Sequence, residues 1–220
     1  MIFGNTILFS EMVPPEAAEQ EFNEWYDHDH IPVRMKAPGF ISGQRYRAAP
    51  RNYLAVYEMD APAALKTPEY DRIKSQPSAQ TRKMLAAVSG FTRYIGNQIG
   101  STCKPGMARQ MENAILYAVW FNVPQNRLAD FDAWYEQEHV PILMENKDWI
   151  AARRFDVVEC DPVVLNRLAL HYISSLSALE SPERQRARET PWRARLAEEP
   201  WFKGIYKTFS RHGARQTAHI

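Results

Sequence analysis

Residues 22–32 (FNEWYDHDHIP) return 109 residues later as residues 131–141 (FDAWYEQEHVP). Without any gap, residues 22–46 align with residues 131–155, and eight of the 25 positions are identical. Background composition would give roughly one or two identities over such a stretch. Two copies are too few for a solenoid, so the chain is predicted to be a duplicated domain with two similar halves.

Each half is predicted to contain one ferredoxin-like unit, with elements in the order β-α-β-β-α-β. Phe22, Trp25, Tyr26 and Asp29 follow the i, i+3, i+4, i+7 spacing of a helix face, which Pro32 is expected to end. In the first half, strands are expected at residues 7–12, 40–47, 53–59 and 91–95, and helices at residues 15–31, 61–75 and 84–88.

The second half repeats this order. Strands are expected at residues 116–121, 149–158, 165–173 and 202–209, and helices at residues 124–140 and within 176–196. Residues 177–183 match residues 63–69 at an offset of 114, so the hairpin has gained five residues (114 − 109). Residues 97–113 are expected to form a linker, and the polar tail from Arg211 onward is expected to be loose.

These elements define two predicted domains, residues 1–100 and 113–212. A single ferredoxin-like unit leaves one sheet face uncovered, and the same face of a second copy can cover it. The predicted fold class is therefore α+β, with two tandem ferredoxin-like units forming a pseudo-dimeric α+β barrel. A homodimer of such chains is compatible with the sequence, which does not require one.

Bulk properties exclude several classes of partner. A formal net charge of +1 provides no basic footprint for nucleic acid. No run of about 18 apolar residues is present, so no membrane partner is expected. The N-terminus lacks the basic and apolar regions of a signal peptide, and Cys103 and Cys160 are isolated from each other, so a reducing cytoplasm is expected. The expected partner is a small-molecule substrate.

The motif W-Y-x-x-[ED]-H-x-P occurs once in each half. Together with residues 38–40 (PGF) and 45–46 (RY), it resembles the EthD-like branch of the dimeric α+β barrel superfamily, and the two copies cover about 200 residues. The resemblance implies a ligand pocket between helices and sheet in each half, with the motif histidine at its mouth. The second half departs from this pattern at residues 147–149 (KDW), so the first pocket is expected to be the working one.

The motif histidine is the residue best suited to chemistry. An imidazole titrates near pH 6.5, so His30 could take up and return a proton at neutral pH. Tyr26 lies one helical turn before it, and Asp29 could orient a partner or anchor the backbone. The partial negative charge of a helix end is expected to favour the imidazolium form. The alternative is that His30 caps the helix end and hydrogen-bonds a carbonyl group. The same catalytic roles extend to His139.

Four further side chains are candidates for binding substrate. Arg45 and its counterpart Arg154 could hold a carboxylate or a phenolate, and their alternative is an ion pair with Asp or Glu. Tyr135 is the counterpart of Tyr26 in the second half. Trp25 is assigned to the substrate-binding group, although its spacing also suits the core. On a regular strand, Phe40 and Arg45 would face opposite sides of the sheet.

The segment at residues 27–30 (DHDH) is rich in groups that could ligate a metal, but no metal site is predicted. His28 and His30 point about 200° apart on a helix and cannot grip one ion together. The second copy lacks the first of these histidines. A lone histidine could ligate haem, but nothing else in the sequence supports haem, so no cofactor is expected.

These observations predict an enzyme that works without a cofactor, a lyase or isomerase that uses His30 as general acid and base. The resemblance implies a small aromatic or polyketide-like carbonyl compound as substrate, with elimination, decarboxylation, dehydration or isomerisation as the reaction. One alternative is a small-ligand-binding or stress-associated protein without catalysis. Another is a cofactorless or haem-dependent monooxygenase.

Overall fold

The structure is a computed structural model that describes residues 3–218. The chain forms two compact units. The first contains the chain up to Asn97, Val158–Pro162 and the chain from His212 onward, and the second contains Gln98–Val157 and Val163–Arg211. The first unit therefore takes in two short segments from the second half of the sequence. No helix among residues 3–218 is long and apolar enough to cross a membrane.

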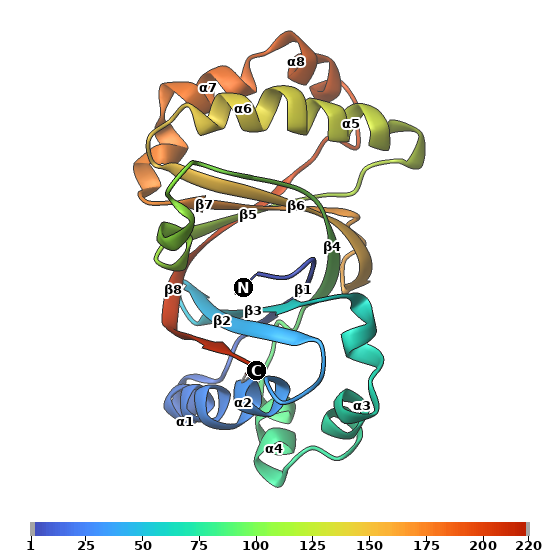
Figure 1. Ribbon diagram of the computed structural model, residues 1–220, viewed down its shortest axis with the longest axis vertical. Coiled ribbons are helices and arrows are strands. Elements are labelled where there is room, and N and C mark those ends of the chain that lie inside the picture. Colours follow the sequence, from blue (N-terminus) through green and yellow to red (C-terminus); the bar gives the residue numbers. More distant parts are fainter. Residues whose placement is uncertain (1–2, 219–220) are drawn as a thin grey trace. The chain divides into compact units, whose positions relative to one another are not determined.

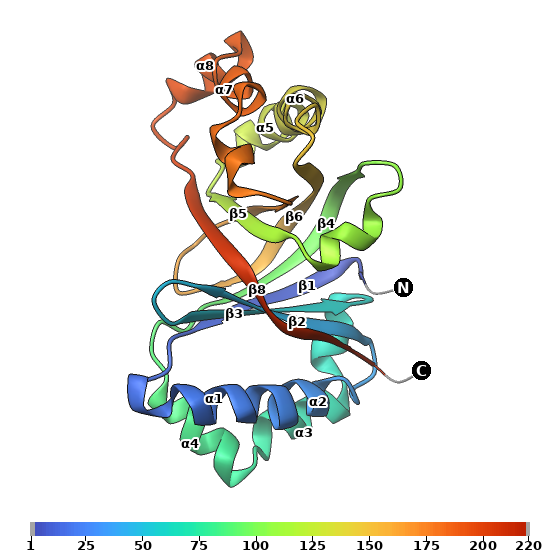
Figure 2. The ribbon, with the colours of Figure 1, turned by 90° about the vertical axis from the view of Figure 1, so that its left-hand side faces the viewer.

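The first unit has four strands, and its four helices lie on one face of the sheet (Figure 2). Its hydrogen-bonded strand order is β4-β1-β3-β2. In chain order its elements are β1 (Thr6–Met12), α1 (Glu19–Trp25), α2 (Ile31–Arg34), β2 (Phe40–Ala48), β3 (Asn52–Met59), α3 (Pro68–Ser75), α4 (Ala79–Ala87) and β4 (Arg93–Cys103).

The second unit repeats this arrangement, with its helices on one face of a sheet of order β8-β5-β7-β6 (Figure 1). In chain order its elements are β5 (Ile115–Phe121), α5 (Leu128–Trp134), α6 (Val140–Met144), β6 (Trp149–Asp161), β7 (Arg167–Ile173), α7 (Pro182–Arg188), α8 (Pro191–Ala197) and β8 (Ile205–Thr217). The duplicated β-α-β-β-α-β order is confirmed.

All eight strands are hydrogen-bonded in the order β1-β3-β2-β8-β5-β7-β6-β4, with β4 returning to β1. This is the strand order of an α+β barrel, so the predicted fold class is confirmed. Two expectations about connecting segments are wrong. The linker contains the second half of β4, and the tail from Arg211 onward is strand up to Thr217. Both segments extend a strand beyond its apolar stretch, because backbone pairing does not need apolar side chains.

The sequence predicted that the motif helix ends at the proline, and this prediction is wrong because the helix continues through it. A π-helical turn at Tyr26–His30 connects α1 to α2, and the same turn recurs at Tyr135–His139. The N–H of Ile31 bonds to the carbonyl of Tyr26, five residues back. A proline in regular α-helix would clash with the carbonyl four residues earlier, whereas the wider turn accommodates it at the start of α2.

A β-bulge changes which side chains share a face of β2. Phe40 pairs with Met59 and Ser42 with Glu58, so Ile41 is the extra residue. One extra residue reverses the alternation of the strand. Phe40 and Arg45 therefore both face the helices, which corrects the expectation that they lie on opposite sides. The same bulge occurs in β6 between Trp149 and Ala151.

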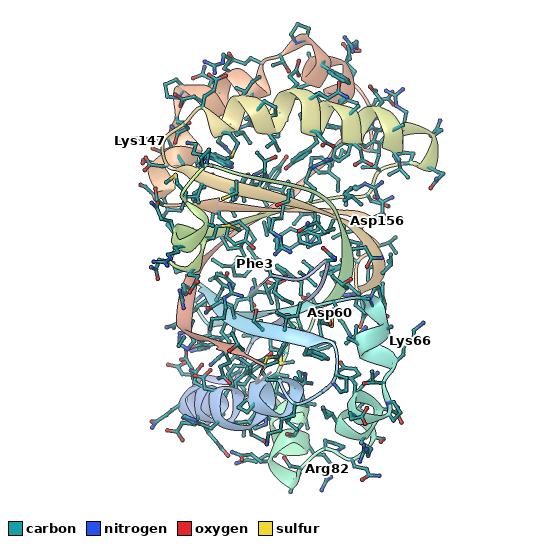
Figure 3. All side chains as sticks on the ribbon, viewed as in Figure 1. Phe3, Asp60, Lys66, Arg82, Lys147 and Asp156 are labelled. Carbon is teal, nitrogen blue, oxygen red and sulfur yellow. The ribbon has the colours of Figure 1, made fainter. Side chains whose placement is uncertain are left out.

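Aromatic side chains fill the space between helices and sheet in each unit. In the first unit, Phe22 and Trp25 pack against the strands, and both are 1% exposed or less. Phe131 and Trp134 occupy the same positions in the second unit. Figure 3 shows the dense side-chain packing in each unit, with Lys147 at an exposed turn before β6.

Candidate functional site

The first unit contains a cavity of about 590 Å³ between its helices and its sheet, called here the first cavity. Three of the predicted catalytic residues of the first half, Tyr26, Asp29 and His30, lie on its wall. Six apolar side chains contribute to the remaining wall: Leu8, Met12, Val33, Ile73, Leu85 and Phe91. A cavity of this size is ordinary for a small-molecule ligand.

His30 is 3% exposed, and its ring lies 4.3 Å from the ring of Trp25 and 4.7 Å from that of Tyr26. Within residues 3–218, no hydrogen bond engages its ring nitrogens. Burial holds the pKa of His30 well below 6.5, and the nearby guanidinium groups of Arg34 and Arg45 lower it further. The imidazole is therefore neutral. The expectation of an imidazolium is wrong, because the helix does not end there and burial disfavours the charged form.

Tyr26 and Tyr57 carry the two phenol hydroxyls beside His30. Burial raises the pKa of Tyr26, and burial followed by the neighbouring Tyr26 raises the pKa of Tyr57 well above 10. The two hydroxyls are close enough to influence each other, but they lack the geometry of a hydrogen bond. In the described part of the chain, the buried Tyr57 hydroxyl has no hydrogen-bond partner. Such a group is costly unless a ligand satisfies it.

A short hydrogen-bond chain fixes Asp29 and Trp25. The indole N–H of Trp25 donates to Thr81 Oγ1 at 3.0 Å, and Thr81 donates to Asp29 Oδ2 at 3.2 Å. Ser78 Oγ donates to the same carboxylate oxygen. Asp29 lies on the wall of the first cavity, whereas Trp25 lies behind His30 and does not reach that wall. Trp25 therefore packs against His30 and supports its position.

Arg45 lies behind Tyr26 and does not line the first cavity. Its guanidinium donates to Asp27 Oδ1 at 2.8 Å and to Asn23 Oδ1 at 2.5 Å, and it stacks 4.6 Å from the Tyr26 ring centre. The structure therefore gives Arg45 the ion-pair geometry that was its alternative, and this geometry does not favour a clamp on a substrate anion.

Arg154 repeats this arrangement in the second unit. It pairs with Glu136 and lies 5.9 Å from the ring centre of Tyr135. The ion pair is again the geometry observed, since its guanidinium is engaged behind the tyrosine.

Arg34 is a cavity residue that the sequence analysis missed. One N–H donates to the carbonyl of His30 at 2.9 Å, its guanidinium lies 5.6 Å from the Tyr57 ring centre, and its buried Nε has no hydrogen-bond partner among residues 3–218. It lies four residues after His30 on α2, a position that a helix ending at Pro32 could not supply. The equivalent residue in the second half is Leu143.

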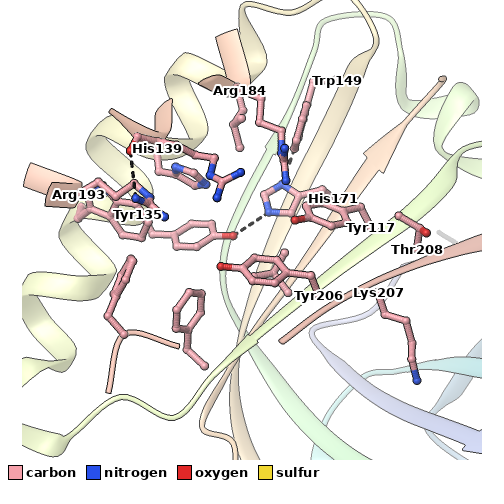
Figure 4. Close-up of a pocket in the computed structure, with 16 residues that line it drawn as sticks. Tyr117, Tyr135, His139, Trp149, His171, Arg184, Arg193, Tyr206, Lys207 and Thr208 are labelled. Carbon is pink, nitrogen blue, oxygen red and sulfur yellow. Dashed lines mark hydrogen bonds between the residues drawn. The ribbon is translucent and has the colours of Figure 1, made fainter. Parts of the chain in front are cut away.

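The second unit contains a cavity of about 350 Å³, called here the second cavity, and both Tyr135 and His139 line it (Figure 4). His139 Nδ1 donates to the carbonyl of Ala187 at 3.3 Å, so this histidine is engaged by the main chain. Burial lowers the pKa of His139 to about 4. The expectation that the helix end favours the imidazolium form is therefore wrong for His139 too. The two motif histidines differ in the hydrogen bonds of their rings, because only His139 bonds to the main chain.

Residues 3–218 contain no group of three or more His, Cys, Asp or Glu side chains placed to hold a metal ion. His28 is exposed on the π-helical turn, whereas His30 is buried.

Neither a protein family nor a curated protein matches this chain in sequence. Solved structures do match. An anthrone oxidase-like protein superposes with a TM-score of 0.69 and 10% identity, covering 98% of this chain and 94% of its own. A putative monooxygenase from Fusobacterium nucleatum and a chlorite dismutase from Candidatus Nitrospira defluvii each give a TM-score of 0.58 and 8% identity. The former covers 95% and 93% of the two chains and the latter 93% and 90%.

The fold is that of the dimeric α+β barrel proteins. At such low identity the likeness shows the fold alone, and proteins with this fold have various activities.

Proposed function

We propose that the first cavity binds a small aromatic or polyketide-like carbonyl compound and moves a proton on it, without a resident cofactor. The reaction class is that of a lyase or an isomerase, as in the EthD-like reading of the motif. The observation that carries this proposal is the imidazole of His30. It is buried, neutral and free of hydrogen-bond partners among residues 3–218, and it lines a cavity of about 590 Å³.

His30 is the general base of the proposed reaction. A neutral imidazole accepts a proton from the carbon beside the substrate carbonyl, the C–H electron pair becomes a C=C bond, and the carbonyl oxygen becomes an enolate. Return of the proton to another carbon gives an isomer. Transfer of the proton to a β-hydroxyl group, which then leaves as water, gives dehydration.

Arg34 and Tyr57 supply the donors that an enolate oxygen needs. Both line the cavity, Arg34 has no carboxylate partner in the described chain, and the Tyr57 hydroxyl is unpaired. Donors fixed in advance around a developing negative charge typically contribute several kcal/mol to catalysis. Burial and then Arg34 keep the pKa of His30 low in the free protein, and the enolate would offset the repulsion between Arg34 and a protonated His30.

The test is hydrogen–deuterium exchange on the substrate. The full chain is incubated in D2O with 2-tetralone and with anthrone, whose acidic C–H groups report proton removal by NMR. We expect the wild-type protein to accelerate exchange, and His30→Ala to lose about 10²–10⁴-fold of that acceleration. His139→Ala should cost much less, because its ring already donates to Ala187.

His28→Ala is the matched control, since His28 lies exposed on the same π-helical turn and should leave exchange unchanged. Melting temperatures of all variants separate lost chemistry from lost folding. Equal exchange by His30→Ala and wild type would refute the role of His30. Tight ligand binding without any exchange would favour the non-catalytic alternative.

A second candidate is oxidation by molecular oxygen, which the likeness to an anthrone oxidase-like protein favours. It shares the first step. The carbanion would add O2 to give a peroxide anion, which takes the proton back from His30. The resulting hydroperoxide loses its remaining C–H proton and its outer oxygen as water and leaves a ketone. An oxygen electrode distinguishes the two candidates, because isomerisation and dehydration consume no oxygen. An absorption spectrum of the purified protein tests the haem-dependent form of this candidate.

A further inference from the structure

The second cavity combines aromatic walls with charge of a single sign. Its charged lining residues are Arg184, Arg188, Arg193 and Lys207, and no Asp or Glu lies on its wall. Rings of tyrosine, tryptophan and phenylalanine form most of the remaining surface (Figure 4). A cavity lined in this way suits a flat apolar body that carries a negative charge.

The three arginines lack the partners that guanidinium groups normally have. Arg184 donates to the main-chain carbonyl of Leu179 at 2.6 Å, and Arg193 donates to that of Arg188 at 3.0 Å. Within residues 3–218, none of the three forms an ion pair with a carboxylate. Partial burial and the neighbouring Arg188 and Arg184 lower the pKa of Arg193. Cations gathered in this way, without counterions, are costly unless an anion joins them.

A hydrogen-bond chain on the opposite wall fixes the direction of a phenol hydroxyl. The indole N–H of Trp149 can only donate, and it lies 3.1 Å from His171 Nδ1. Burial holds the pKa of His171 at about 3, so the ring carries one proton, and that proton must be on Nε2. His171 Nε2 therefore donates to the Tyr135 oxygen at 2.8 Å. The hydroxyl proton of Tyr135 is therefore not used in the bond to His171. Because Tyr135 lines the cavity, this proton can be donated to a ligand there.

The first half does not build this chain. The residue equivalent to His171, at an offset of 114, is Tyr57, and the residue equivalent to Trp149, at an offset of 109, is Phe40. Tyr57 makes no hydrogen bond to Tyr26, whereas His171 bonds directly to Tyr135. Arg184 corresponds to Tyr70, and Arg193, three residues after the N-cap Thr190 of α8, corresponds to Thr81, three residues after the N-cap Ser78 of α4. The two cavities therefore differ in charge and in hydrogen bonding, which indicates different ligands.

We propose that the second cavity is a binding site for an aromatic carboxylate. The carboxylate group lies on the arginine cluster, the ring contacts the aromatic wall, and Tyr135 donates its hydroxyl proton to the bound anion. This site is independent of the proton-transfer chemistry proposed for the first cavity. The cavity of about 350 Å³ accommodates one small fused aromatic ring system.

The experiment is isothermal titration calorimetry of the full chain with 2-naphthoate. Its uncharged analogue 2-naphthalenemethanol and inorganic phosphate serve as comparison ligands. We expect 2-naphthoate to bind at least about tenfold more tightly than either, because only it offers both the charge and the ring. A charge-assisted hydrogen bond is worth about 1.5–3 kcal/mol, so Arg193→Met should weaken binding of 2-naphthoate by about ten- to a hundredfold.

Matched variants locate the site and test the hydrogen-bond chain. Arg188→Met changes an exposed side chain, so it reports the loss of charge even if Arg193→Met folds poorly. His171→Gln can still accept from Trp149 and donate to Tyr135, so it should bind within about twofold of wild type, whereas His171→Leu should bind several-fold more weakly. Arg34→Leu introduces the leucine of the second half into the first cavity and should leave this binding unchanged.

Several outcomes would overturn the proposal. The proposal fails if 2-naphthoate does not bind, or if 2-naphthalenemethanol or phosphate binds as tightly as 2-naphthoate. It also fails if both arginine variants bind 2-naphthoate with wild-type affinity. Loss of binding in Arg34→Leu alone would place the ligand in the first cavity. Equal weakening by His171→Gln and His171→Leu, with intact folding of both, would refute the role of the Tyr135 hydroxyl.

Discussion

His30 and His139 occupy the same position of the repeat, yet different groups surround their ring nitrogens. The His30 imidazole has no hydrogen-bond partner among the residues described, whereas His139 donates to the carbonyl of Ala187. The difference arises outside the motif, because Ala187 belongs to α7 and no residue of α3 reaches His30 in the same way. An unengaged neutral imidazole can act as a base, and an engaged one is better suited to holding a helix in place.

At the same scale, the tautomer of His171 is open to direct observation. Long-range ¹H–¹⁵N spectra should show Nε2 protonated and Nδ1 unprotonated from pH 8 down to pH 5, because burial lowers the pKa of His171 to about 3. The Trp149→Phe variant, which reproduces Phe40 of the first half, removes the donor to Nδ1 and should yield a mixture of tautomers. A protonated Nδ1 in wild type, or titration near pH 6.5, would contradict the chain Trp149–His171–Tyr135.

Two irregular elements place the side chains of each cavity. The π-helical turn at Tyr26–His30 carries the helix past Pro32 and brings Arg34 to the cavity wall. The bulge at Ile41 turns Arg45 toward the helices, where it supports Tyr26 from behind. Both irregularities recur in the second unit, where the bulge also allows Trp149 to reach His171.

The turn between α2 and β2 depends on Gly39 for two separate reasons. Its φ of 84° is unfavourable for other residues, and a Cβ there would lie 2.7 Å from the Cβ of Ala64. Gly106 has a φ of 74° with no heavy atom within 4 Å of an added Cβ, so Gly106→Ala tests the φ term alone. We expect Gly106→Ala to cost about 1 kcal/mol of unfolding free energy and Gly39→Ala about 2–4 kcal/mol, measured by urea denaturation. Equal losses of unfolding free energy in the two variants would mean that Ala64 moves aside without an energetic cost.

At the scale of the whole molecule, the end of the chain belongs to the fold of the first unit. Gln216 donates to the carbonyl of Asp27 at 2.8 Å, and Arg215 donates to Ser42 Oγ at 3.0 Å. Deleting the chain from His212 onward should therefore expose the edge of β2. We expect hydrogen exchange over Phe40–Ala48 to become at least about tenfold faster, measured by mass spectrometry. Exchange over β7 is the internal control, and unchanged exchange in β2 would show that the tail contributes nothing.

Three deeply placed histidines make the stability of the molecule sensitive to acid. The pKa of His30 is well below 6.5, that of His139 is about 4 and that of His171 is about 3, each chiefly through burial. The unfolded chain takes up these protons near pH 6.5 and the folded chain does not. The unfolding free energy should therefore fall as the pH drops from 6.5 toward 5, by up to about 1.4 kcal/mol per pH unit for each histidine.

Urea denaturation at pH 7, 6 and 5 measures this slope. The His171→Gln variant removes one of the three protons, so its slope between pH 6 and 5 should be smaller by about 1.4 kcal/mol per pH unit. Stability that is constant over this range would show that the three imidazoles already bind protons in the folded state.

The sequence alone determined the duplication, the order of elements and most of the core, because helix and strand periodicities are properties of neighbouring residues. It also pointed to His30, Tyr26 and Asp29, which the structure brings to one cavity.

Only the tertiary structure decided the rest. Arg34 was missed and the facing of Arg45 was misassigned, because a π-helical turn and a bulge each break the period from which side-chain direction is inferred. The Tyr135–His171–Trp149 chain joins three elements that only the pairing of β6 with β7 and the packing of the helix onto that sheet bring together. The lowered pKa values of the histidines follow from burial, which depends on packing across the whole unit and leaves no signal in the local sequence.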